Sequence, residues 1–239
     1  FVMKDGFITV AAATPEVVVA DCVANTHNII ERVRALEAQH AKLMVFPELC
    51  ITGYTCSDLF WQDKLLDAAQ DALITIARET AAVNALIVVG LPLRAKGKLM
   101  NVAAALNRGR VLGFVPKQNL PAYNEFYEAR HFCAGSACDG TVAIDGVDVP
   151  VGANLLFTCS TMPNFVVALE LCEDLWVPCP PSINHALAGA TVIANLSASD
   201  EMIGKNSYRR ALVSGQSGRL VCAYLYATAG LGESTTDLV

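Results

Sequence analysis

Three residues whose types could together hydrolyse an amide each follow a separate apolar segment. Glu48 follows KLMVF in the stretch FPEL, Lys117 follows VLGFV in PKQNLP, and Cys172 ends NFVVALELC in LELCEDLW. A thiol can attack an amide carbonyl and form a thioester, a carboxylate can carry the thiol proton to the leaving ammonia, and an ammonium can stabilise the oxyanion. The three side chains therefore predict acyl transfer to a cysteine, provided that the fold brings them together.

The sequence around Cys172 is acidic, which disfavours a reactive thiolate. Glu170 lies two residues before the cysteine, and Glu173 and Asp174 follow it directly. Negative neighbours raise the pKa of a thiol, so a cation from elsewhere is needed, and Lys117 is the candidate. Each of the three groups also has a simpler interpretation, as a surface carboxylate, a solvated lysine and a cysteine of the core.

Apolar patterns predict the elements that must position these residues. Helices are expected over 24–41 and 62–82, after the prolines of 178–181, and over 205–219. Strands are expected near 6–14, 42–46, 86–89, 154–158, 165–171, 191–195 and 221–228, with two strands and a turn over 101–117. Residues 118–140 show little periodicity and predict a long ordered loop. The alternation predicts a single α/β domain with a mixed, helix-covered sheet and functional residues at strand ends.

Composition limits the possible classes of protein. The 239 residues are 54% hydrophobic and 17% charged, which predicts a folded domain. A net charge of −6 without a cluster of Lys and Arg argues against a nucleic-acid partner, and the apolar runs are too short to span a bilayer. Nine cysteines without a CxxC pair argue against a zinc site. They favour a reducing, cytoplasmic setting in which most cysteines are small core residues.

The segments FPELCITGY, PKQNLPAYNEFYEARHF and LELCEDLW resemble the three catalytic segments of the nitrilase superfamily of carbon-nitrogen hydrolases. The resemblance is closer to the glutaminase domains of glutamine-dependent NAD⁺ synthetases, through GYTCSDLF, IANLSASDEMIGK, YRRALVSGQSGRL and the ending GLGESTTDLV. It implies a four-layer α-β-β-α sandwich of two mixed sheets over residues 1–239. It also implies a triad of Glu48, Lys117 and Cys172 that releases ammonia from glutamine through a thioester.

The same resemblance implies further site residues. Glu128, in EFYEAR, matches a second family glutamate that supports the lysine. Positions that line the glutamine pocket in this branch are matched by Tyr54, Tyr123, Glu173, Ser199 and Lys205. Lys205 and Ser199 suit the α-carboxylate of glutamine, and Glu173 suits its α-ammonium. For Tyr54 and Tyr123, ordinary packing inside the protein explains the residue as well as contact with a substrate does.

The resemblance is incomplete toward the end of the chain. Such synthetases use the ammonia to amidate deamido-NAD⁺ in an ATP-dependent domain marked by an SGGxDS phosphate loop, and no such loop is present here. The chain stops at TTDLV, where family members continue, so a C-terminally truncated domain is expected. This part would need no cofactor and no metal, with ATP and Mg²⁺ confined to the missing synthetase domain. Its expected partners are glutamine, that domain and further copies of itself.

Two other classes of function stay open. A free-standing nitrilase-type amidase or carbamoylase would use the same three residues on another small amide. A non-catalytic α/β interaction module would leave all nine thiols similarly slow to react with an alkylating reagent. A Cys–His arrangement of the protease kind has no partner by motif among His27, His40, His131 and His185.

Overall fold

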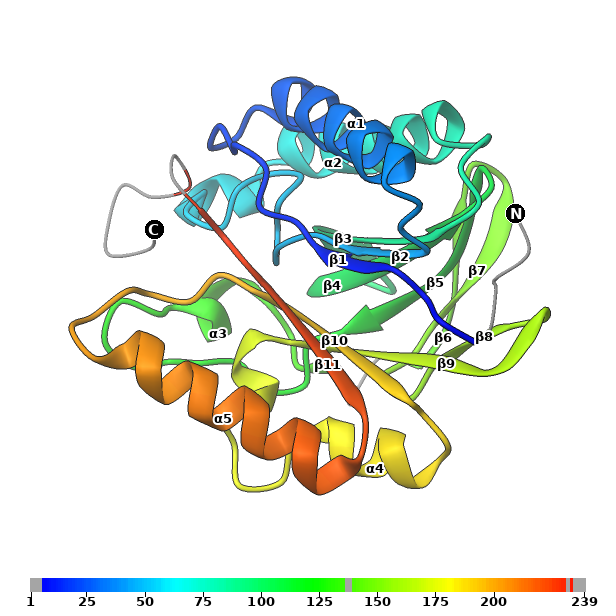
Figure 1. Ribbon diagram of the computed structural model, residues 1–239. Coiled ribbons are helices and arrows are strands. Elements are labelled where there is room, and N and C mark those ends of the chain that lie inside the picture. The colour runs from blue at the N-terminus through cyan, green and yellow to red at the C-terminus, as the bar shows by residue number, and fades with distance from the viewer. Residues whose placement is uncertain (1–5, 136–138, 231–232, 234–239) are drawn as a thin grey trace.

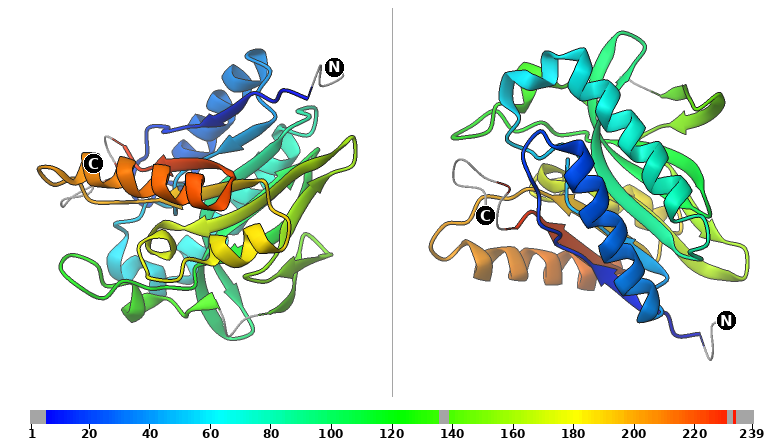
Figure 2. Two further views of the ribbon diagram at one scale, coloured as in Figure 1. Left: turned by 60° about the horizontal axis from the view of Figure 1, so that its bottom comes forward. Right: turned by 90° about the horizontal axis from the view of Figure 1, so that it is seen from above.

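Two mixed β-sheets packed face to face, with helices on both outer faces, form the fold (Figure 1). The computed structural model describes residues 6–135, 139–230 and 233. Helices α1 (Cys22–Ala38) and α2 (Asp63–Glu79) cover one sheet, and α4 (Pro181–Leu187) and α5 (Lys205–Leu220) cover the other (Figures 1 and 2). The four-layer α-β-β-α sandwich is thereby confirmed, while the mixed sheet expected from the strand order turns out to be two sheets.

The larger sheet has seven strands in the order β1-β2-β3-β4-β5-β7-β6. Its strands β1, β2 and β3 are parallel, as helix crossovers require, and β3, β4 and β5 follow as antiparallel hairpins. The bounds are β1 Val10–Ala12, β2 Leu43–Val45, β3 Leu86–Ala95, β4 Lys98–Asn107, β5 Arg110–Pro116, β6 Gly140–Ile144 and β7 Val147–Val151.

The smaller sheet has four strands in the order β11-β10-β9-β8. Strands β9 (Met162–Leu171), β10 (Val192–Ser197) and β11 (Ala223–Thr228) are parallel, and β8 (Leu156–Cys159) pairs antiparallel with β9. The parallel strands end at the same edge, so residues that follow them meet there. An apolar layer that includes Leu43, Val88, Leu169 and Leu196 fills the space between the two sheets.

The helices follow from the spacing of their apolar residues. In α2, Leu65, Leu66, Leu73 and Ile76 are all buried on one side of the helix, as the sequence predicts. Helix α1 ends at Ala38, earlier than expected, and His40 two residues later has a φ of +63°, which an α-helix does not allow. No helix within the described residues is long and apolar enough to cross a membrane.

Two sequence-based predictions of strands are wrong. Strand β3 does not end at Gly90 but runs on to Ala95. A side chain at position 90 would overlap the backbone of Pro47, Glu48 and Leu49, so this glycine permits close approach of two chains and does not mark an end. The hairpin of β6 and β7 was missed because its two strands are short and only three of their ten residues are buried, so they contain no long apolar run.

Candidate active site

The three predicted catalytic residues lie at strand ends that face one another across the sandwich. Glu48 follows β2 and Lys117 follows β5, both in the seven-stranded sheet. Cys172 follows β9 of the four-stranded sheet and begins the 3₁₀ turn η3 (Cys172–Leu175). Glu48 and Lys117 are fully buried, and Cys172 is 5% exposed. Buried charges are rare in proteins unless they are paired, so these positions require partners.

Lys117 forms a buried ion pair with each of two carboxylates. Its Nζ lies 2.7 Å from Oε1 of Glu48 and also donates to Oε1 of Glu128, the first residue of the short helix α3 (Glu128–His131). Asn101 in β4 donates to Oε1 of Glu48 at 2.6 Å, and the N–H of Ala198 donates to Oε2 at 3.1 Å. Both oxygens of Glu48 are therefore held, which fixes the direction of the carboxylate.

The two carboxylates keep the lysine charged. Burial opposes the ammonium form, but attraction to Glu128 and Glu48 outweighs it and raises the pKa of Lys117 well above its ordinary 10.5. Burial likewise raises the pKa of Glu128 to about 7, against the attraction of Lys117. A single positive charge thus lies between two carboxyl groups, and one of them, Glu128, is close to its pKa at neutral pH.

Glu128 is further held by the tyrosine predicted to line a substrate pocket. The hydroxyl of Tyr54 donates to Oε1 of Glu128 at 2.6 Å, and burial raises the pKa of that phenol well above its ordinary 10.0. Tyr54 therefore lies against the ion cluster and stays protonated. Its contact with a substrate stays a prediction.

Cys172 has a backbone conformation that few types of residue adopt readily. Its φ is +39°, in the left-handed region, and its N–H donates to Oδ1 of Asn195 at 3.2 Å. Beyond the effect of burial, the charge of Glu48 raises the pKa of the Cys172 thiol, and Lys117 and the side chain of Ser197 lower it. The strand end and the hydrogen bond to Asn195 present the thiol to the ion cluster.

The thiol is protonated at neutral pH. Its pKa is raised from an ordinary 9.0 to about 12, mainly by burial and then by the charge of Glu48, and Lys117 partly offsets the rise. The expectation that Lys117 favours the thiolate is correct in direction, but burial and the carboxylates outweigh the lysine. A thiol with so high a pKa would need a base to take its proton before it could act as a nucleophile, and the role of Glu48 as that base stays a prediction.

Alkylation of Cys172 by iodoacetamide is expected to accelerate about tenfold per pH unit, without a plateau, between about pH 7 and about pH 9. The rate follows the thiolate fraction, and the pKa of about 12 lies above that range. Peptide mass spectrometry resolves each site. Cys159 is the comparison, because hydrogen bonding to Thr161, at 3.3 Å between the side chains, outweighs burial and lowers its pKa, so its rate should level off earlier. A plateau for Cys172 near pH 8 would show a preformed thiolate instead.

The acidic residues that flank Cys172 in sequence are bonded elsewhere. Glu170 accepts hydrogen bonds from the hydroxyl of Tyr224 and, at 2.9 Å, from a backbone N–H at the start of α4. Glu173 accepts a hydrogen bond from the hydroxyl of Tyr123 at 2.8 Å. Glu170 and Glu173, which in the sequence argue against a reactive thiol, are therefore hydrogen-bonded to other groups of the protein.

Asp174, the third acidic neighbour, joins the segment after Lys117 to the segment around Cys172. It accepts hydrogen bonds from the N–H groups of Gln118 at 3.2 Å and Asn119 at 2.8 Å, and from the backbone just before Cys172 at 3.1 Å. Burial raises its pKa to about 6, and these donors oppose the rise. One carboxylate thus ties the chain that follows Lys117 to the turn that carries Cys172.

The residues predicted to bind the α-groups of glutamine already have protein partners. Lys205 forms an ion pair with Asp200 and lies over the ring of Trp176, 5.2 Å from its centroid. Ser199 is buried, and its hydroxyl accepts a hydrogen bond from Arg209 at 3.2 Å. These two residues are therefore held near one another through Asp200 and Arg209, and their contact with a substrate stays a prediction.

The sequence interpretation missed several polar residues of the site. Asn101 and Asn195 each lie inside a buried strand, and Arg209 is 9% exposed in α5. A polar residue within an otherwise apolar strand is a usable signal, because a buried polar group requires a hydrogen-bond partner. NVAAAL and VIANLS contain that signal, whereas nothing in the pattern of α5 distinguishes Arg209 from an exposed arginine.

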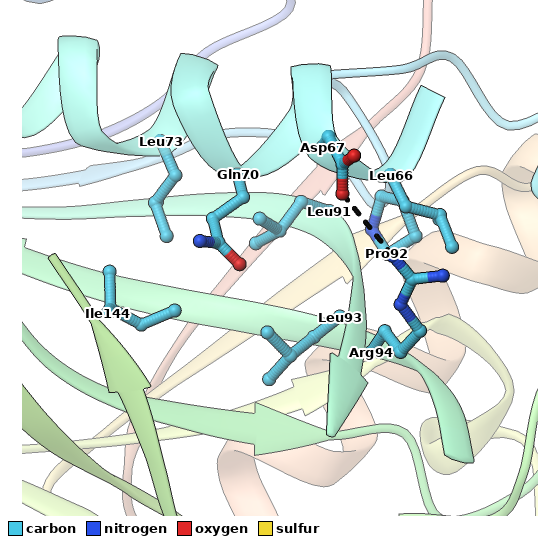
Figure 3. A pocket seen from close by; sticks show the side chains of 9 residues that line it. All are labelled: Leu66, Asp67, Gln70, Leu73, Leu91, Pro92, Leu93, Arg94 and Ile144. Carbon is cyan, nitrogen blue, oxygen red and sulfur yellow. Dashed lines mark hydrogen bonds and ion pairs between the residues drawn. The ribbon is translucent and has the colours of Figure 1, made fainter. Parts of the chain in front are cut away.

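A hollow elsewhere in the molecule is not part of this site. It lies between α2 and β3, and leucines of both elements line it together with Asp67, Gln70 and Arg94 (Figure 3). Arg94 pairs with Asp67 at 3.3 Å at its rim. None of the residues that line it is a Ser, Thr, Cys, Lys or His that could act as a nucleophile. Across the residues the structure describes, no group of three or more His, Cys, Asp or Glu is arranged to hold a metal ion.

Comparison with known proteins identifies relatives along nearly the whole chain. Residues 9–223 match the model of the carbon-nitrogen hydrolase family. The chain is 48% identical over 235 residues to the glutamine-dependent NAD(+) synthetase of Mycobacterium tuberculosis, and 42% identical over 235 residues to that of Mycobacterium leprae. Each match covers 98% of this chain and 35% of the relative, so the chain spans about a third of the length of these proteins.

Solved structures give the same result. The glutamine-dependent NAD(+) synthetase from Cytophaga hutchinsonii superposes with a TM-score of 0.80 at 31% identity, over 90% of this chain and 35% of that one. An amidase from Nesterenkonia sp. superposes with a TM-score of 0.73 at 20% identity, over 96% of this chain and 78% of that one. The second likeness concerns the fold alone.

Proposed function

The chain belongs to the carbon-nitrogen hydrolase family, and from that premise we propose that it hydrolyses the side-chain amide of glutamine through a cysteine thioester. The observation that carries the proposal is the buried Lys117, paired with Glu48 and Glu128 and acting on the sulfur of Cys172. A nucleophile, a base and a cation are the groups that amide hydrolysis needs. The identity with proteins named glutamine-dependent NAD(+) synthetases supports glutamine as the amide.

In the first half of the reaction, Sγ of Cys172 attacks the amide carbon. The S–C bond forms while Glu48 takes the thiol proton, and the carbonyl oxygen becomes an oxyanion that Lys117 stabilises, together with N–H groups near Glu173. The C–N bond then breaks, and Glu48 returns its proton to the nitrogen, which leaves as ammonia. The product on the enzyme is a glutamyl thioester.

In the second half, water attacks the thioester carbon. Glu48 takes a proton from that water, and the C–O bond forms as a second oxyanion develops beside Lys117. The C–S bond breaks, Glu48 protonates the sulfur, and glutamate leaves. Glu128 takes no proton in this scheme; together with Glu48 it holds the ammonium of Lys117 in place.

The α-groups of glutamine need charged partners at the mouth of the site. We assign the α-carboxylate to Lys205 and Ser199, and the α-ammonium to Glu173, which Tyr123 orients at 2.8 Å. Asp200 now pairs with Lys205, and an incoming carboxylate would share that ammonium. Charge-assisted bonds of this kind discriminate strongly between an amino acid and a plain amide.

The proposed setting is a larger synthetase in which residues 1–239 form the ammonia-producing domain. There the ammonia would amidate deamido-NAD⁺ to NAD⁺, with ATP and Mg²⁺ bound by a synthetase domain outside this sequence. The length comparison supports this arrangement, because the chain corresponds to 35% of each relative. A cytoplasmic location and a homo-oligomeric assembly belong to the same proposal.

Glutamine is expected to exceed butyramide in kcat/KM by at least about 100-fold. Butyramide lacks both α-charges, and each charged hydrogen bond contributes about 1.5–3 kcal/mol. Ammonia release by the complete protein, measured over a concentration series of each amide, gives the ratio. A preference for butyramide or for a carbamoyl compound would favour a free-standing amidase or carbamoylase and would overturn glutamine as the substrate.

A further inference from the structure

Polar side chains of two neighbouring strands form paired contacts beneath α4 and α5. Asn195 and Ser197 lie two residues apart in β10, so they point to the same face of the sheet. Tyr224 and Tyr226 have the same spacing in β11. The amide of Asn195 donates to the hydroxyl of Tyr224 at 3.2 Å, and the hydroxyls of Ser197 and Tyr226 lie 2.6 Å apart. Each β10 residue thus has its own tyrosine.

The two β10 residues of these pairs are related to Cys172 in different ways. Asn195 accepts the backbone N–H of Cys172 at 3.2 Å and so holds the turn. Leu196 lies opposite Leu171 in the parallel pairing of β10 and β9, so Ser197 lies beside Cys172. Its side chain lowers the pKa of the Cys172 thiol. Its backbone carbonyl also accepts the N–H of Glu48 at 3.3 Å, which places the serine between the nucleophile and the base.

We propose that Ser197 is a further catalytic residue, which donates a hydrogen bond to the sulfur of Cys172 as the thiolate forms, and that Tyr226 positions it. The inference rests on the proposed function, because it takes Cys172 as the nucleophile. A serine hydroxyl has one hydrogen and can also accept. When Tyr226 donates to Oγ of Ser197, the serine hydrogen is free to point at the sulfur.

The surroundings of the two hydroxyls suit this direction of donation. Burial raises the pKa of Tyr226 above its ordinary 10.0, so the phenol stays protonated and remains a donor. In a chain of hydrogen bonds each bond polarises the next, and the effect is strongest away from water. Lys117 has three N–H donors, and Glu48 and Glu128 occupy two of them. The hydroxyl of Ser197 would be a second donor that stabilises the negative charge developing on the sulfur.

Other titratable groups also act on the sulfur and must stay constant in any test. They lie in the segments after β2 and β5, before and within α3, and in α5 and β11: Glu48, Tyr54, Lys117, Tyr123, Glu128, Lys205 and Tyr226. Ser197→Ala removes a neutral hydroxyl and leaves every one of these charges in place. A change in the titration of the thiol in that variant therefore reports the hydroxyl.

The test is the rate of Cys172 alkylation by iodoacetamide across pH in Ser197→Ala and Tyr226→Phe. At a fixed pH we expect alkylation to slow about tenfold in Ser197→Ala, since one hydrogen bond to a charged group is worth about one pKa unit or more. Tyr226→Phe should slow it less, and Ser197→Thr should restore it. Ser182→Ala is the matched control: this buried serine in α4 accepts from Gln216 at 2.9 Å and should leave the profile unchanged.

Circular dichroism and thermal unfolding establish that each variant is folded. If Ser197→Ala does not fold, the alkylation profile of Tyr226→Phe tests the inference, because that variant keeps the ring that fills the core. Wild-type alkylation profiles in both variants would overturn the inference. Protection of wild-type Cys172 by glutamine tests the proposed function separately. If glutamine protects Cys172 while both variants match the wild type, only the role of Ser197 fails, and if glutamine gives no protection, the proposed function fails.

Discussion

Cys172→Ala is expected to lower ammonia release from glutamine by at least about 10⁴-fold, because the thioester cannot form without the sulfur. The remaining ion cluster can bind and polarise an amide, but it holds no other nucleophile. The variant should stay folded, since the change removes one sulfur from a site that is already 5% exposed. Ammonia release by the purified protein, together with circular dichroism, checks both statements.

Cys179→Ala is the matched control, because Cys179 is an exposed free cysteine seven residues along the chain. Its activity should equal that of the wild type. Hydrolysis of glutamine at the wild-type rate by Cys172→Ala would remove the nucleophile from the proposed mechanism. It would leave the non-catalytic interaction module as the better account of the chain.

Glu48→Gln is expected to lower kcat by about 10² to 10⁴-fold, the usual contribution of a general base. The amide of glutamine fits the same space and can still accept the hydrogen bond from Lys117. It cannot take the thiol proton, which burial holds with a pKa of about 12. Single-turnover measurement of ammonia release separates this chemical step from binding.

Glu128→Gln provides the matched comparison for that loss. Both substitutions replace a carboxyl group beside Lys117 with a neutral amide, and both glutamates accept a hydrogen bond from its Nζ. Only Glu48 is proposed to carry the proton, so Glu128→Gln should slow the reaction much less. Equal losses in the two variants would assign the effect to the charge balance of the cluster and would refute Glu48 as the base. Chemical unfolding of both variants shows whether stability contributes.

The sequence predicts the strand ends of the site well, because the apolar runs stop where the reactive groups begin. Strand β9 ends at Leu171, directly before Cys172, and the strand before Glu48 was expected over 42–46 and is observed over Leu43–Val45. Local periodicity contains no information on which strands share a sheet. The division into two sheets therefore came only from the family resemblance.

The polar support of the site was harder to predict for a physical reason. Asn101 contacts Glu48 and Asn195 contacts Cys172 across 53 and 23 positions of sequence, respectively. Such contacts depend on the register between strands, and a shift of one residue would turn each side chain to the other face. Gly90 illustrates the same limit, since its role follows from backbone that approaches it from another segment.

The carboxylate of Asp174 has a consequence for how freely the core of this protein can change. Apolar packing between two sheets is non-directional, so it resists separation more strongly than sliding. Lys117 and Cys172 belong to different sheets, yet Asp174 bonds the backbone beside both of them. A repacked core that displaces one sheet slightly along the other would change stability while the ammonium and the sulfur keep their separation. We therefore expect the proposed reaction to tolerate small changes in the packing between the two sheets.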